Sequence, residues 1–204
     1  MALPRPSAPE IEEQALVAGM QAGDDDAFEL CVRRFCDRLL AVARRILNND
    51  EDARDAVQDA FASAFREIVR FEARSGLGTW LHRIAVNAAL ARLRSRRRRP
   101  EKSIEDLLPH FGEDEHQIDP PAAWQSLPAS RLEQQETRDV VQRCILKLPE
   151  IYRTVLVLRD VEVIGTDDVA GMLGTSVGVV KTRLHRARQA LRTLLDPHFR
   201  EGEP

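Results

Sequence analysis

The chain has 204 residues, of which 43% are hydrophobic and 31% are charged, and its formal net charge is -3. This composition supplies enough apolar surface for one medium or two small folded cores, which excludes a chain that is disordered throughout. No segment approaches the roughly 20 apolar residues of a membrane-spanning helix, and no signal-peptide cleavage site is found near the start of the chain. We therefore expect a soluble, cytoplasmic protein with no stable membrane insertion.

The small net charge hides separate acidic and basic blocks. Residues 10–29 hold seven acids and no Lys or Arg, whereas residues 92–99 hold six arginines. Residues 101–119 hold seven acids and one lysine, and residues 181–192 hold five basic residues and no acid. Two basic clusters on either side of an acidic stretch indicate a protein that contacts nucleic acid at two places.

Hydrophobic periodicity predicts helices from the start of the chain. A short leading helix lies at about 11–20, within a terminal segment 1–24. Two amphipathic helices run roughly over 26–47 and 50–69, because apolar residues recur there at intervals of three and four. The polar residues 48–50 are expected to supply the turn and the helix cap between them.

The segment 71–78 breaks this pattern with two glycines. Thr79 is then expected to cap a fourth helix that extends to about residue 94. Together these elements predict a first all-α domain over residues 25–99.

Residues 100–130 contain five prolines and scattered acids without a sustained period, which predicts an extended, flexible, acidic linker. A second small all-α domain is expected over 131–204. Its predicted helices cover about 132–148, 151–158, 167–173 and 177–195.

The most specific local pattern lies at residues 166–191 and predicts a helix-turn-helix. Ala170 is small enough for a helix crossing, Gly174 suits the turn, and Val180 is expected to face inward. The second helix then presents basic and polar side chains that suit guanine edges and phosphates. A basic, solvated helix is the alternative.

Two further constellations lie in the first domain. The loop 71–78 and the basic helix after it could hold unstacked bases and phosphates, although Trp80 at helical spacing is also typical of a core residue. The acidic ridge of Asp52, Asp55 and Asp59 is by default a solvated face, and it is too spread out for a single metal ion.

The sequence contains no catalytic motif and no metal site, so we expect neither an enzyme nor a cofactor. Cys31, Cys36 and Cys144 lack the CxxC spacing typical of zinc ligands. We expect them to be small, buried, apolar side chains. An enzyme or metal sensor that uses these cysteines and the histidines is therefore disfavoured.

Taken in order, three segments resemble the extracytoplasmic-function (ECF) sigma factors, group IV of the bacterial primary-sigma family. They are DARDAVQDAFASAF, FEARSGLGTWLHRIAVNAALARLRSRRRR and LPEIYRTVLVLRDVEVIGTDDVAGMLGTSVGVVKTRLHRARQALRTLL. The resemblance implies two helical domains, sigma region 2-like and sigma region 4-like. It also implies a non-catalytic initiation subunit that binds core RNA polymerase and promoter DNA.

The resemblance also implies roles for individual residues. It assigns core polymerase binding to Asp52, Asp55, Gln58 and Asp59. It assigns the downstream (minus ten) motif, where strand opening begins and a base leaves the non-template strand, to Arg74, Ser75, Trp80, Arg83, Asn87, Arg92 and Arg94. It assigns the duplex of the upstream (minus thirty-five) element to Ser176, Val177, Lys181, Thr182, Arg183 and Arg186.

The family's linkers thread through polymerase channels, and its members are commonly held inactive by an anti-sigma factor, which is expected here as a partner. Two departures bear on DNA binding: Asp168 stands where the family commonly has Glu, and Val179 lacks the hydroxyl of the usual threonine. The alternative function is a stand-alone helix-turn-helix regulator that binds operator DNA as a dimer. A stand-alone regulator would have no role for the loop 71–78 or for the basic helix that follows it.

Overall fold

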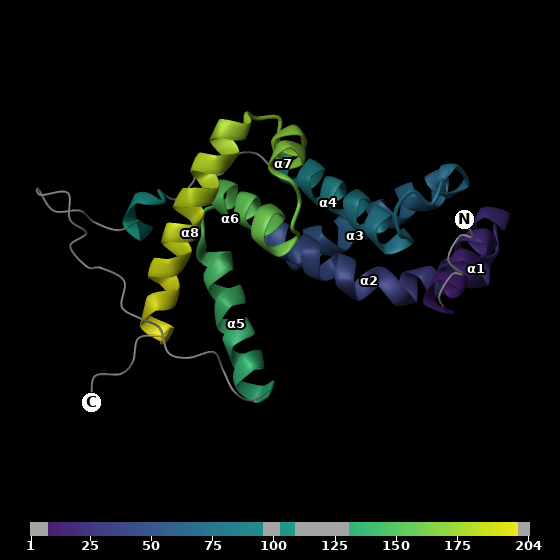
Figure 1. The fold of residues 1–204 in the computed structure, drawn as a ribbon, viewed down its shortest axis with the longest axis horizontal. Helices are drawn as coiled ribbons and strands as arrows, with labels where there is room; N and C mark the ends of the chain where they lie inside the picture. Colours follow the sequence, from purple (N-terminus) through teal and green to yellow (C-terminus); the bar gives the residue numbers. More distant parts are fainter. Residues whose placement is uncertain (1–7, 96–102, 109–130, 200–204) are drawn as a thin grey trace, which may run out of the picture. The chain divides into compact units, whose positions relative to one another are not determined.

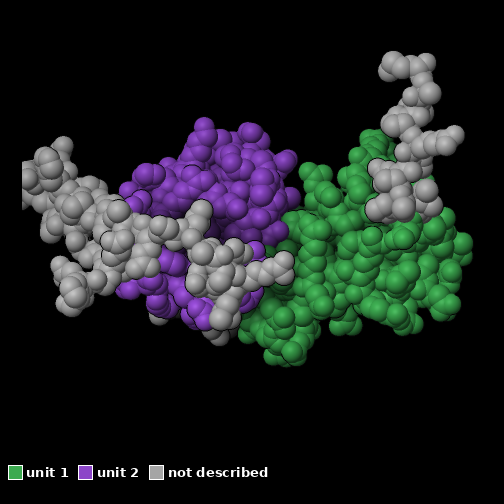
Figure 2. Space-filling model, turned by 60° about the horizontal axis from the view of Figure 1, so that its bottom comes forward, with its two compact units in different colours: residues 1–97 green, residues 98–204 purple. Residues whose placement is uncertain are grey.

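The computed structural model describes residues 8–95, 103–108 and 131–199. Every element in these ranges is a helix or a helical turn (Figure 1). The chain divides into two compact units, residues 1–97 and residues 98–204, which Figure 2 colours separately. The predicted all-α fold class is therefore confirmed. Within the described ranges, no helix is both long and apolar enough to cross a membrane.

The first unit is a bundle in which three long helices pack against one another. Its elements are α1 (Ala8–Ala22), α2 (Asp25–Leu47), α3 (Asp50–Glu67), the short 3-10 turn η1 (Ile68–Arg70) and α4 (Leu77–Ser95). Helices α2, α3 and α4 each contact the other two, and α1 packs on α2 and η1. The apolar stripes of these helices meet in a core that includes Leu39, Ile46, Leu81 and Val86. Each such side chain contributes about 1.5 to 3 kcal/mol when it is fully buried.

The polar residues between α2 and α3 act as the sequence predicts. Asn48 ends α2 in the left-handed conformation, with φ of 48°, and its amide donates to the carbonyl of Arg44. Asn49 begins α3, and its side-chain oxygen accepts from the amide of Asp52 at 2.9 Å. Asparagine tolerates positive φ and caps well, so this tight turn follows from local chemistry.

The start of α4 differs from the prediction, which placed the cap at Thr79. The helix begins at Leu77, and the carbonyl of Gly76 accepts from the amides of Thr79 and Trp80 at 3.0 and 3.1 Å. Gly76 has no side chain to cap the first turn. The carboxylate of Glu13 in α1 takes that place, accepting from the amide of Leu77 at 2.7 Å. A cap from a residue 64 positions away replaces the local one.

The second unit is built around its last helix. Its elements are the 3-10 turn η2 (Glu105–Leu107), α5 (Arg131–Lys147), α6 (Glu150–Leu156), the π-helical turn η3 (Val157–Val161), α7 (Thr166–Leu173) and α8 (Val177–Phe199). Helix α8 contacts α5, α6, α7 and η2. The core of this unit includes Cys144, Leu148, Val155, Val180 and Ala187.

One short part of the predicted linker is folded onto the second unit. Within residues 103–108, the turn η2 contacts α8, and Ile104, just before the turn, is only 3% exposed. The proline content of residues 100–130 as a whole gives no sign that Ile104 is buried. The linker residues 109–130 and the arginine run 96–99 lie outside the described residues.

Candidate nucleic-acid interface

Helices α7 and α8 form the predicted helix-turn-helix. Gly174 ends α7 with φ of 61°, a conformation that glycine adopts without a steric cost. The hydroxyl of Ser176 accepts from the amide of Val179 at 3.3 Å, which supports the predicted cap of α8. Val180 and Ala187 are fully buried on the inner side of α8. The turn therefore fixes the direction in which the opposite side of α8 faces.

The residues predicted to contact the upstream element lie in the N-terminal half of α8 and just before it. Lys181, Thr182 and Arg186 are exposed, and so is Ser176. Val177 and Arg183 are half-buried. Val179 is 37% exposed, so an apolar side chain stands among the polar ones. This arrangement presents two forked guanidinium donors, of Arg183 and Arg186, and several single donors on a helix of the diameter that a major groove accepts.

Two arginines of α8 have acidic partners in the second unit. Arg188 forms a two-pronged ion pair with Asp160, at 2.8 Å from Nε and 2.6 Å from Nη2. Hydrogen bonding to Asp160 raises the pKa of Arg188 above its usual value. Arg186 lies 3.6 Å from Glu105 of η2. Arg188 therefore braces α8 against η3, whereas Arg186 makes a looser, exposed pair.

In the first unit, the loop 71–76 presents the other predicted DNA-binding side chains. Arg74 and Ser75 are exposed, and Ala73 adopts a left-handed backbone with φ of 52°. The ring of Trp80 lies 4.9 Å from that of Phe71, between centroids. Trp80 is half-buried, so its indole contacts Phe71 at the start of the loop and is also partly accessible to solvent.

Along α4, three of the predicted residues share one exposed face. Arg83, Asn87 and Arg94 are all exposed, and at about 100° per residue they lie within about 40° of one another around the helix. Arg92 follows Arg83 by nine residues and therefore points about 180° away from it.

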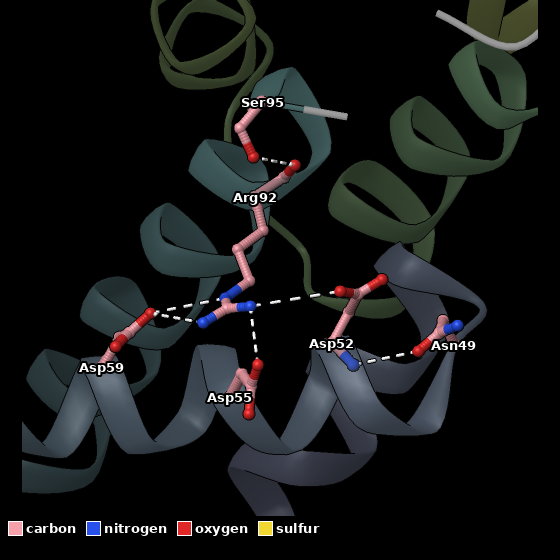
Figure 3. A network of polar contacts seen from close by, with 6 residues as sticks. All are labelled: Asn49, Asp52, Asp55, Asp59, Arg92 and Ser95. Carbon is pink, nitrogen blue, oxygen red and sulfur yellow. Dashed lines mark hydrogen bonds and ion pairs between the residues drawn. The ribbon is translucent and has the colours of Figure 1, made fainter. Parts of the chain in front are cut away.

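Arg92 faces α3 and joins the acidic ridge (Figure 3). Its Nη1 lies 2.8 Å from Asp55 Oδ2, and its Nη2 lies 3.0 Å from Asp59 Oδ2. Asp52 Oδ1 is 4.0 Å from the same Nη1. The side chain of Arg92 is only 30% exposed. One guanidinium thus holds together three carboxylates that would otherwise repel one another.

We expect the Arg92→Ala substitution to lower the free energy of unfolding by about 1 kcal/mol, because it removes shared ion pairs that are only partly screened by solvent. Urea denaturation followed by circular dichroism measures this change. Arg94→Ala is the matched control, since Arg94 is an exposed arginine two residues later on the same helix. Equal effects of the two substitutions would contradict a bracing role for Arg92.

Gln58 lies apart from the three aspartates, in the wall of an apolar groove between α2 and α3. The groove has a volume of about 460 Å³. It is lined by Val32, Cys36, Leu40, Arg54, Val57, Gln58, Phe61, Ala62 and Phe65. The four predicted core-binding residues therefore belong to two surfaces of α3, one acidic and one apolar.

The three cysteines occupy different environments. Cys31 and Cys144 are buried, whereas Cys36 is half-buried in the groove wall. Burial raises the pKa of the Cys31 thiol to about 11, and nearby Arg34 only partly offsets this rise. Among the described residues, no cluster of three or more His, Cys, Asp or Glu side chains suits a metal ion.

We therefore expect iodoacetamide at pH 8 to modify Cys36 first, and Cys31 and Cys144 only after unfolding, because the thiolate is the reacting form and needs access to solvent. Peptide mass spectrometry over a time course measures the three rates. Equal rates at all three cysteines in the folded protein would contradict these environments.

Two residues near the loop 71–76 were not identified from the sequence. Glu13 caps α4, and Gln21 Nε2 donates to the carbonyls of Ile68 and Phe71 at 3.1 and 3.3 Å. Both come from α1, whose periodicity is weak. Local capping rules examine only neighbours in sequence, so they give no sign of these contacts.

Comparison with known proteins finds the same two regions. Residues 31–99 match the family described as Sigma-70 region 2, and residues 138–191 match Sigma-70, region 4. The chain is similar to the RNA polymerase sigma-H factor of Pseudomonas aeruginosa, with 35% identity over 94% of this chain and 97% of the relative. It is 37% identical to the ECF RNA polymerase sigma factor SigM of Mycobacterium tuberculosis, over 91% of this chain and 86% of the relative.

A solved structure with a similar fold is the sigma factor RpoE from Bartonella quintana, crystallised with the anti-sigma factor NepR. It is 25% identical to this chain, with a TM-score of 0.50, and the match covers 82% of this chain and 96% of that one.

Proposed function

The chain belongs to the ECF sigma factors of RNA polymerase. From this premise we propose which of its surfaces binds core polymerase and which binds each promoter element. It binds core polymerase through α3, recognises the upstream element through α8, and captures the downstream motif through the loop 71–76 and α4. The single observation that carries this division is a helix-turn-helix in the second unit together with an exposed basic face beside an irregular loop in the first.

The upstream element is bound as duplex. The exposed side chains of Lys181, Thr182 and Arg186 favour this, because arginine and lysine donate to guanine edges and phosphates in the major groove. Arg183 contributes a further fork beside them. Ser176 and Val177, at the start of the helix, lie where backbone amides attract phosphate.

The downstream motif is bound as single strand. Arg74 and Ser75 on the loop, with part of the Trp80 ring, supply donors and an aromatic surface for an unstacked base. Arg83, Asn87 and Arg94 continue this surface along one face of α4 and suit the strand's phosphates. We assign Arg92 to the acidic ridge and not to DNA binding, because its guanidinium forms ion pairs with Asp55 and Asp59.

Core polymerase binds the outer side of α3. The apolar groove suits the side chains of a partner helix, Gln58 in its wall offers a hydrogen bond, and the ridge of Asp52, Asp55 and Asp59 attracts basic residues. An apolar hollow beside a charged ridge is typical of an interface with an apolar centre and a polar rim.

We expect Leu40→Glu to weaken core binding by at least about tenfold, because a carboxylate in the groove wall loses water on docking without gaining a partner. Leu30→Glu is the matched control: Leu30 lies on the same helix, is 49% exposed and is absent from the groove wall. Fluorescence titration with core polymerase measures both affinities. Similar losses for the two variants would remove the groove from the docking site.

The chain is a binding subunit without catalytic activity of its own, and it acts in the cytoplasm, where the polymerase works. An anti-sigma factor holds it inactive, by analogy with the similar sigma factor of Bartonella quintana, which was crystallised in complex with the anti-sigma factor NepR.

The proposal is tested by multi-round transcription with bacterial core polymerase on a pool of genomic promoter fragments, followed by sequencing of the transcript starts. Discrete starts that share two spaced upstream motifs, and that need both the chain and core polymerase, are expected. Starts that core polymerase produces equally well without the chain would contradict it.

A further inference from the structure

The loop 71–76 is held at both of its ends by the same helix. At its entry, Gln21 Nε2 donates to the carbonyls of Ile68 and Phe71, at 3.1 and 3.3 Å. At its exit, Glu13 Oε1 accepts from the amide of Leu77, at 2.7 Å. Gln21 follows Glu13 by eight positions in α1, which is about 12 Å along the helix axis. We propose that α1 is a clamp that positions this loop for capture of the unstacked base, with Glu13 and Gln21 as positioning residues.

Each contact suits the group that it meets. A carboxylate at the N-terminus of α4 satisfies a backbone amide that Gly76 cannot cap, and it interacts favourably with the helix dipole. The side-chain amide of Gln21 donates to the carbonyl of Phe71, the first loop residue, and to that of Ile68, which also accepts from the amide of Phe71. The atoms that Gln21 and Glu13 contact, in Ile68, Phe71 and Leu77, are all backbone atoms, so the clamp fixes the path of the chain at the loop's two ends. Arg74 and Ser75 stay exposed.

The clamp is itself anchored. Leu16 and Met20 of α1 are buried, at 5% and 1% exposure, and they lie on the helix between the two contacting residues. Glu13 lines a polar hollow together with Arg34 and Arg38 of α2.

The loop requires such support. Ala73 adopts a left-handed backbone conformation, which a non-glycine residue maintains only when its surroundings hold it there. The entry is further braced by the contact of the Phe71 ring with Trp80. The match to Sigma-70 region 2 begins at residue 31, so α1 lies outside it. Loop position is therefore set in part by residues outside the matched region.

This proposal rests on the proposed function, and its test uses holoenzyme assembled from the full chain and core polymerase. Opening is followed by 2-aminopurine in the non-template strand of promoters that the wild-type holoenzyme uses. The variants are Glu13→Ala combined with Gln21→Ala, and Glu13→Gln alone. The control is Glu12→Ala, at an exposed position on the same helix.

We expect the double variant to slow opening about tenfold, because it removes hydrogen bonds at both ends of the loop. It should also reduce the penalty for a changed base in the downstream motif. Core affinity and the penalty for a changed upstream element should stay as in the wild type. Glu13→Gln should retain at least about half of the wild-type rate, since its amide oxygen still accepts from Leu77.

Opening by the double variant at the rate of the Glu12→Ala control would overturn the proposal. An equal loss of core affinity and of upstream recognition would also overturn it, because that pattern indicates general destabilisation. A wild-type chain that opens no promoter overturns the proposed function itself. Amide hydrogen exchange at Leu77 tests the clamp without any promoter: it should quicken in Glu13→Ala, and unchanged exchange would contradict the contact.

Discussion

Arg183→Ala should weaken recognition of the upstream element by roughly 1 to 3 kcal/mol, or about 5-fold to 150-fold, while core binding stays unchanged. The reason is position: Arg183 is half-buried in the N-terminal half of α8, next in sequence to the exposed donors Lys181 and Thr182. Holoenzyme binding to promoters with the native and a scrambled upstream element measures the change.

Arg188→Ala is the matched control, because it removes the same charge from the same helix at a residue that is paired with Asp160. It should lower stability and leave the preference for the native element intact. If Arg183→Ala weakened binding equally on native and scrambled promoters, Arg183 would contact phosphate alone and the assignment to base recognition would be wrong.

Replacing Asp55 and Asp59 together by asparagine should weaken core binding by at least about tenfold, because close charge pairs across an interface contribute strongly to affinity. The structure adds a complication, since both carboxylates pair with Arg92. Loss of the pair could therefore act through stability alone. Titration of the chain with core polymerase, with circular dichroism as a check on folding, measures the effect.

Arg92→Ala separates the two explanations. It removes the brace but leaves the carboxylates in place, so core affinity should be maintained even though stability falls. If Arg92→Ala reduced core affinity as much as the double asparagine variant, the ridge would serve the fold of the first unit and would not dock on polymerase.

Much of this arrangement follows from short-range sequence chemistry. The turn at Asn48 and Asn49, the glycine after α7 and the cap at Ser176 depend on residues within four positions of one another, and the structure has each of them as expected. The apolar intervals of α2 and α3 likewise set which sides are buried. These features are local, so a pattern in the sequence is enough to predict them.

What could not be predicted depends on contacts between distant residues. The pairing of Arg92 with Asp55 joins residues 37 apart, and the cap from Glu13 joins residues 64 apart. The charge run that begins at Arg92 suggests one basic surface, yet the helical rotation turns Arg92 away from Arg83. That rotation could have been derived from spacing alone, whereas the identity of the partner helix required the packed structure.

Promoter specificity that this chain gives to core polymerase is tested most directly by binding of labelled promoter DNA to the chain alone, to core polymerase alone and to both together. Specific, salt-resistant binding only when both are present is the predicted result. Specific binding of duplex by a dimer of the chain alone, unchanged when core polymerase is added, would contradict it and indicate a stand-alone regulator.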